Sequence, residues 1–135
     1  MRRYLPALAV LLVLPLFSLA EKPTPSKKPL GTWQRQSEGL KITFAIKPDS
    51  LQLTLVDESG NKTKADAAIG LTNNNLLFGV ITEVDSSGQG PEKGDLFSFN
   101  YEVKNGQLVI SDLKGTRVND EARKHVEGEY KSVGK

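Results

Sequence analysis

The residues that most often carry chemistry are sparse in this chain. It contains one histidine, His125, and no cysteine. Disulfides, thiolate metal sites, a cysteine nucleophile and the lipid-bearing cysteine of a bacterial lipoprotein are therefore excluded. No second histidine can join His125 at a metal, and no G-x-S-x-G segment offers a serine nucleophile. General base chemistry by His125 is open in principle, but we expect a solvated histidine at a helix end and a protein that is not an enzyme.

Acidic side chains gather around the polar segment 85–94, DSSGQGPEKG. If Asp85 is taken as the first ligand of a calcium loop, Leu96 occupies the twelfth position, where a bidentate glutamate is required. No helix follows Gly88 and Gly90 to hold a phosphate. We therefore expect no metal and no cofactor, and interpret the segment as a mobile hairpin loop. A more specific interpretation is that the loop forms a rim that contacts a ligand or a partner. The nearby acids are interpreted as edge charges rather than as a glycosidase pair: Glu83, Asp85, Glu92 and Asp95.

The first 20 residues have the pattern of a secretory signal peptide. Arg2 and Arg3 precede an apolar run over residues 4–17, and small residues lead to a cleavage site after Ala20. The run is shorter than the ~20 residues that cross a bilayer, so we expect no membrane span after cleavage. The sequence thus predicts a secreted or periplasmic protein. Residues 21–29 hold three prolines and three lysines and predict an extended linker.

The balance of charge gives no sign of a polyanionic partner. Removing residues 1–20 lowers the number of basic residues from 18 to 16, which equals the 16 acidic residues. No basic face is interleaved with stacking aromatic side chains, so nucleic acid is not expected as a partner. The remaining 115 residues are enough for one domain with its own core.

Alternating apolar and polar residues dominate the rest of the chain. In residues 40–46 and 51–55 every second side chain is large and apolar, which predicts a β-hairpin with one buried face. A single hairpin cannot shield that face, so a closed or stacked sheet is needed. Further strands are predicted by similar patterns at residues 30–35, 62–71, 76–84, 95–103, 108–113 and 129–133.

Two local signals complete the prediction of the fold. Asn105-Gly106 is typical of a type I′ hairpin turn. Residues 119–126 form the only predicted helix, with Asn119 or Asp120 as its N-cap and Gly128 as its stop. Residues 30–135 are therefore predicted to form an all-β domain, an antiparallel up-and-down barrel of about eight strands with one short helix before the last strand.

Short motifs at both ends of this domain resemble a known family. Gly31-Thr32-Trp33 resembles the Gly-x-Trp signature of the lipocalin-like (calycin) superfamily, and residues 128–131 resemble the ending of short lipocalin-like domains in exported bacterial proteins, which are mostly uncharacterised. The resemblance implies that Trp33, with Gly31 and Tyr130, closes one end of the barrel. It also implies that a basic side chain, Arg117 or Arg123, packs on the indole ring.

Aromatic rings provide the candidate binding residues. An eight-stranded barrel is either filled by its side chains or holds one small ligand. The rings expected to line such a cavity, or to fill the barrel, are Phe44, Phe78, Phe97, Phe99 and Tyr101. The first hypothesis is a non-catalytic carrier of a small apolar or amphipathic ligand, open at an end bounded by loops 73–75 and 85–94. The alternative is a cell-envelope or protein-interaction module with a filled barrel and a partner that the sequence does not specify.

Overall fold

The computed structural model describes residues 27–85 and 90–133. The predicted signal peptide, most of the predicted linker and the centre of the loop at 85–94 lie outside these residues.

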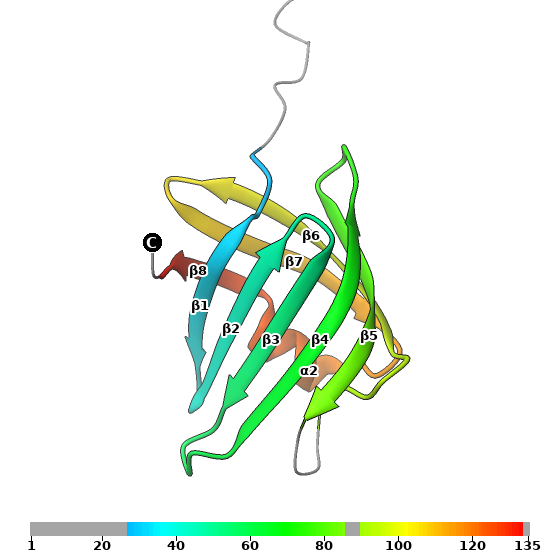
Figure 1. The fold of residues 1–135 in the computed structure, drawn as a ribbon. Coiled ribbons are helices and arrows are strands. Elements are labelled where there is room, and N and C mark those ends of the chain that lie inside the picture. Colours follow the sequence, from blue (N-terminus) through cyan, green and yellow to red (C-terminus); the bar gives the residue numbers. More distant parts are fainter. Residues whose placement is uncertain (1–26, 86–89, 134–135) are drawn as a thin grey trace, which may run out of the picture.

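Eight antiparallel strands form a closed barrel in which each strand pairs with the next along the chain (Figure 1). The last strand also pairs with the first, so the sheet has no free edge. This confirms the predicted all-β fold. The strands are β1 (Gly31–Ser37), β2 (Leu40–Lys47), β3 (Ser50–Val56), β4 (Lys62–Leu71), β5 (Leu76–Asp85), β6 (Leu96–Lys104), β7 (Gln107–Gly115) and β8 (Gly128–Ser132).

The alternation of side chains along each strand places the core inside the barrel. Phe44 on β2 lies opposite Trp33 on β1 and Leu53 on β3, so these three apolar residues share the inner face. The Phe44 ring lies 5.4 Å from the ring of Tyr130 on β8 and 6.0 Å from that of Phe99 on β6. Rings at these distances pack favourably, and they link strands that are far apart in sequence.

The hairpin between β6 and β7 confirms the predicted turn type. Asn105 and Gly106 both have positive φ, +53° and +76°. A type I′ turn requires this pair of conformations, and its twist matches that of the flanking strands.

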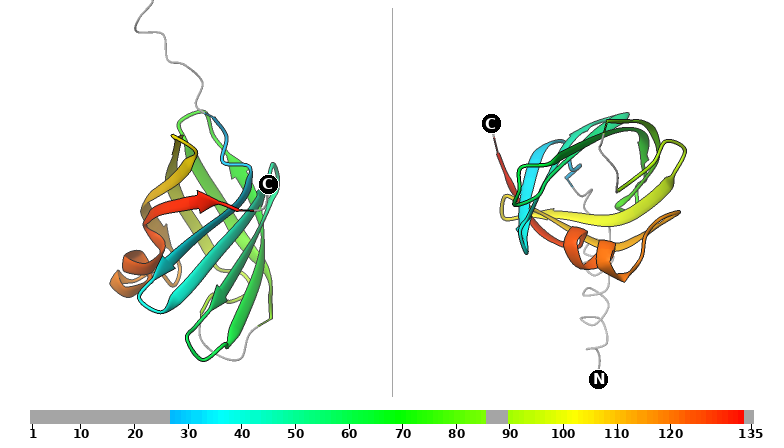
Figure 2. Two further views of the ribbon diagram at one scale, coloured as in Figure 1. Left: turned by 90° about the vertical axis from the view of Figure 1, so that its left-hand side faces the viewer. Right: turned by 90° about the horizontal axis from the view of Figure 1, so that it is seen from below.

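The predicted helix is also confirmed. The helix α2 (Asp120–Val126) begins after Asn119, whose side chain accepts a hydrogen bond from the amide of Ala122. Figure 2 shows α2 beside β7 and β8, at the lower part of the barrel in Figure 1. β8 pairs with only Trp33 and Gln34 of β1. Farther along β1, Arg35 and Ser37 form hydrogen bonds with His125 of α2.

The described ends of the chain lie at the same end of the barrel. Val133 donates its amide to the carbonyl oxygen of Thr32, at the start of β1. Pro29, which the sequence placed in the linker, is fully buried and accepts a hydrogen bond of 3.0 Å from the indole nitrogen of Trp33. The last residue of the predicted linker thus packs against the barrel, where its carbonyl group satisfies a buried donor.

Candidate ligand-binding cavity

A cavity of about 1120 Å³ occupies the end of the barrel opposite Pro29. Its mouth is formed by the β3–β4 turn, by residues 90–95 before β6, and by residues 116–119 before α2. One side of α2 contributes to its wall. The apolar residues of the lining are Leu40, Phe44, Leu51, Leu53, Leu55, Ile81, Pro91, Phe97, Phe99, Leu113, Val118, Ala122 and Val126. Leu96 borders the mouth, but its side chain is 62% exposed on the outer face of β6.

Three of the five aromatic residues singled out by the sequence line this cavity. Phe44 and Phe99 are buried, and Phe97 is half-buried nearer the mouth. The rings of Phe97 and Phe99 are stacked at 6.4 Å. Together these rings form an apolar wall that reaches from the barrel core towards the mouth.

Phe78 does not line the cavity. It is 48% exposed on the outside of the barrel, where its ring lies against Gly70 on the neighbouring strand. β5 has apolar residues at both odd and even positions, so the alternation did not predict whether Phe78 faces the inside or the outside of the barrel. Its ring covers a cross-strand glycine, a known way to protect a glycine in a sheet.

Tyr101 is also absent from the lining, although it is only 5% exposed. Its side chain belongs to the packed core rather than to the cavity. Burial raises the pKa of its phenol group.

The two loops expected to frame the mouth lie at opposite ends of the barrel. Residues 73–75 precede β5 and the described residues 90–94 follow it, so the length of one strand separates them. Consecutive connections of an up-and-down barrel always alternate between its two ends, and the expectation overlooked this rule. The described residues 90–95 of the second connection and the β3–β4 turn bound the mouth instead.

Trp33 is buried at the closed end, but neither predicted arginine lies against it. Arg117 follows β7 at the mouth, and Arg123 lies on α2, where its Nε donates to the carbonyl oxygen of Leu113. The basic side chain beside the last strand is Arg35 of β1, whose charge acts on the phenol group of Tyr130. The resemblance implied an arginine near the last strand, and Arg35, from the strand that carries Trp33, lies beside β8 against Gly128. Gly31, the first residue of β1, has a φ of +123°, and a methyl group added there would lie 3.9 Å from the indole nitrogen of Trp33.

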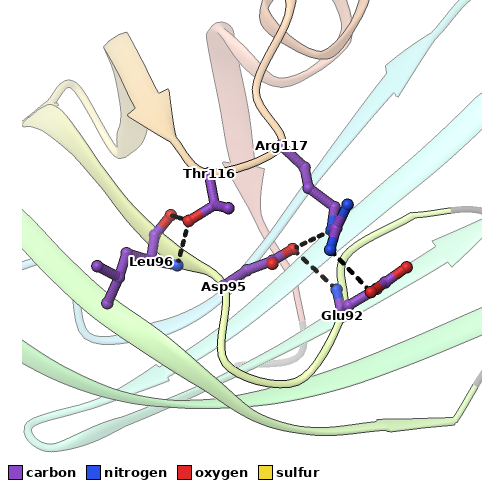
Figure 3. A network of polar contacts seen from close by, with 5 residues as sticks. All are labelled: Glu92, Asp95, Leu96, Thr116 and Arg117. Carbon is purple, nitrogen blue, oxygen red and sulfur yellow. Dashed lines mark hydrogen bonds and ion pairs between the residues drawn. The ribbon is translucent and has the colours of Figure 1, made fainter.

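A network of polar contacts holds the two connections at the mouth together (Figure 3). Asp95 is only 7% exposed. Its Oδ2 forms an ion pair with Arg117 Nε at 3.0 Å and accepts a hydrogen bond from the Glu92 amide at 2.9 Å. Arg117 Nη2 also contacts Glu92 Oε1 at 2.8 Å. Beside this group, the Thr116 hydroxyl accepts a hydrogen bond from the Leu96 amide at 2.9 Å. These contacts give residues 92–96 and 116–117 a fixed arrangement.

Asp57 supplies a second carboxylate at the mouth, on the β3–β4 turn. Hydrogen bonds from the backbone and side chain of Asn61 lower its pKa, and the amide of Ser59 also donates to it. This carboxylate therefore stays ionised at lower pH than an ordinary aspartate.

The structure also joins three residues that the sequence did not connect. His125 lies between Ser37 and Glu121, with Nδ1 at 3.1 Å from the serine Oγ and Nε2 at 3.1 Å from a glutamate Oε2. The spacing of Glu121 and His125 is that of neighbours on a helix, but Ser37 is 88 positions from His125. These residue types occur in hydrolases. However, Ser37 is only 8% exposed and does not line the cavity, so the contacts serve to fix α2 against β1.

The described residues contain no cluster of three or more side chains suited to hold a metal ion. Among the same residues, no helix has the length and apolar character needed to span a membrane. Comparisons with protein-family models, with curated proteins and with solved structures found no match to this chain.

Proposed function

We propose that this protein is an exported, lipocalin-like carrier that binds a small apolar or amphipathic molecule and performs no catalysis. The observation that supports it is the cavity: about 1120 Å³, apolar along its interior and polar at its mouth. Ligand pockets for small molecules have volumes of roughly 300–1,000 Å³ with a mainly apolar lining and a few polar groups. An eight-stranded barrel is also just wide enough to hold one such molecule.

The proposed export rests on residues 1–20, whose charged start, apolar run and small residues at the cleavage site are typical of a signal peptide. The proposed family rests on the Gly31-Thr32-Trp33 motif at the start of an eight-stranded barrel. Trp33 lies at the end opposite the mouth, as the resemblance implies for the closed end of such a barrel.

A neutral fluorescent probe, N-phenyl-1-naphthylamine, tests the carrier function directly. We expect its emission to rise on titration with the purified protein and to saturate at one probe per chain. Leu53 lines the cavity opposite Phe44, so a Leu53→Trp variant narrows the space and should weaken probe binding by at least ~10-fold, about 1.4 kcal/mol. Phe78→Ala removes a ring outside the barrel and is the matched control. Saturable binding that Leu53→Trp leaves unchanged would contradict the proposal.

The alternative, a protein-interaction module, is favoured by the outer surface of β5 and β6. Phe78 and Leu96 are exposed, and Leu96 pairs with Val80 on β5. Large apolar residues on an outer sheet face are a feature of contact surfaces. If Phe78→Ala abolishes co-purification of a partner while probe binding is absent, this second function replaces the first.

A further inference from the structure

The most unusual polar group of the cavity is the carboxylate of Asp95. A buried carboxylate needs charge compensation and hydrogen bonds, because burial removes its water. The two contacts of the Asp95 side chain drawn in Figure 3 reach the same oxygen, Oδ2. Among the described residues, no hydrogen bond reaches Oδ1. A carboxylate accepts at both oxygens, so Asp95, a lining residue, has one acceptor atom without a hydrogen bond from the described part of the chain.

The charges around Asp95 make the mouth negative. Arg117 is shared between Asp95 and Glu92, so this group of three carries a net formal charge of −1. Asp57 and Glu121 also line the cavity. Arg117 is the only lysine or arginine among the described lining residues, and Lys93 on the neighbouring segment is exposed and outside the lining.

We propose that the cavity selects amphiphiles with a cationic head group that donates hydrogen bonds, such as a primary alkylammonium. The apolar chain lies among Phe44, Phe97 and Phe99, and the ammonium group binds Oδ1 of Asp95. An ammonium offers three donors and a positive charge, which satisfies both the free acceptor and the negative mouth. A carboxylate head offers no donor and is repelled by the same groups. This inference rests on the proposed carrier function.

Four probes share a ten-carbon chain and differ only in the head group, so they isolate the contribution of the head group to binding. They are decylammonium, decyltrimethylammonium, 1-decanol and decanoate. Each displaces N-phenyl-1-naphthylamine from the protein at pH 7, in 20 mM and in 500 mM NaCl. We expect decylammonium to bind at least ~10-fold more tightly than decanoate and ~3-fold more tightly than decanol at low salt. Decyltrimethylammonium, which has the charge without an N–H donor, should fall below decylammonium. High salt should reduce the preference over decanoate, because it screens charges at the mouth.

Substitutions then assign the preference to Asp95. Asp95→Asn keeps the size of the side chain and removes its charge, so decylammonium should bind at least ~5-fold less tightly while decanol changes less than ~2-fold. Asp112→Asn is the matched control, since Asp112 contacts Lys114 and Asn100 and does not line the cavity. Its φ of +54° also suits asparagine.

The outcomes distinguish this inference from the carrier function beneath it. Equal binding of the decyl probes with ammonium, hydroxyl and carboxylate heads overturns the proposed selectivity and leaves the carrier function in place. Failure of every probe to displace the dye, or failure of the dye to bind, overturns both. The wild-type comparison decides the selectivity even if Asp95→Asn does not fold.

Discussion

Arg35 Nε donates a hydrogen bond of 2.9 Å to the carbonyl oxygen of His125, which joins β1 to the last turn of α2. The same guanidinium lies directly against Gly128, the first residue of β8. Gly128 has a φ of +140°, a backbone conformation that residues other than glycine rarely adopt. Arg35 can therefore pack here only because residue 128, where the chain passes from α2 to β8, is a glycine.

Gly128→Ala should lower the free energy of unfolding by about 2–4 kcal/mol, because the new methyl group overlaps the Arg35 guanidinium and the backbone is strained. Gly60→Ala is the control: Gly60 also has positive φ, +87°, but no atom lies within 4 Å of the added methyl group. Its cost should be about 1–2 kcal/mol. Urea unfolding followed by the fluorescence of Trp33, the single tryptophan, measures both. Equal losses would show that crowding at Arg35 contributes nothing.

Stability should fall at alkaline pH because of two buried tyrosines. Burial raises the pKa of Tyr130 far above the usual value of 10.0, although the charge of Arg35 acts in the opposite direction. Burial also raises the pKa of Tyr101. The neutral phenols thus stabilise the fold fully below pH 10, and this contribution is lost as pH rises towards the folded-state pKa values.

Urea unfolding between pH 8 and pH 11 measures this dependence. Tyr130→Phe should reduce the slope above pH 10. At pH 7 the same change should cost about 1–2 kcal/mol, because the carbonyl oxygen of Val126 loses a hydrogen bond of 2.7 Å from the phenol. An unchanged slope in this variant would mean that another group titrates.

The ion pair between Arg117 and Asp95 should show strong coupling in a double-mutant cycle. Arg117→Gln leaves the buried Asp95 carboxylate without its cation and should cost about 1–3 kcal/mol. Asp95→Asn in the same background should then cost much less than it does alone. Additive losses would indicate that Arg117 is held by Glu92 alone. Lys104→Gln, which breaks an exposed ion pair with Glu102, should change stability by less than about 1 kcal/mol.

The contact between Ser37 and His125 should affect stability rather than catalysis. Ser37→Ala should lower the free energy of unfolding by about 1 kcal/mol, because one hydrogen bond to the imidazole is lost. Hydrolysis of p-nitrophenyl butyrate should be the same for this variant and for the wild-type protein. An esterase activity that disappears with Ser37→Ala would overturn the non-catalytic function.

The sequence predicted the order and type of the elements because each strand carries its own alternation and each turn its own chemistry. Asn105-Gly106 fixed one hairpin, and Asn119 capped the helix where expected. Contacts between distant segments were not predictable in this way. The position of Phe78 depends on Gly70 across the sheet, and the partner of Arg117 depends on how two connections meet at the mouth.

The same limit applies to the cavity. The alternation identified Phe44, Phe97 and Phe99 as inward-facing, but it could not show which inward-facing residues are packed together and which surround open space. Tyr101 belongs to the first group and Phe97 to the second, although both lie on β6 with the same parity. The closing of one barrel end by Trp33 and Pro29 creates this difference.

Lys27 and Val133, the outermost described residues, both leave the barrel at the end sealed by Trp33. A tag, a support or a neighbouring domain attached through either of them would extend away from the entrance between Asp57 and Arg117. The barrel can therefore be held on a surface through Lys27 or Val133 while its interior stays accessible to molecules in solution.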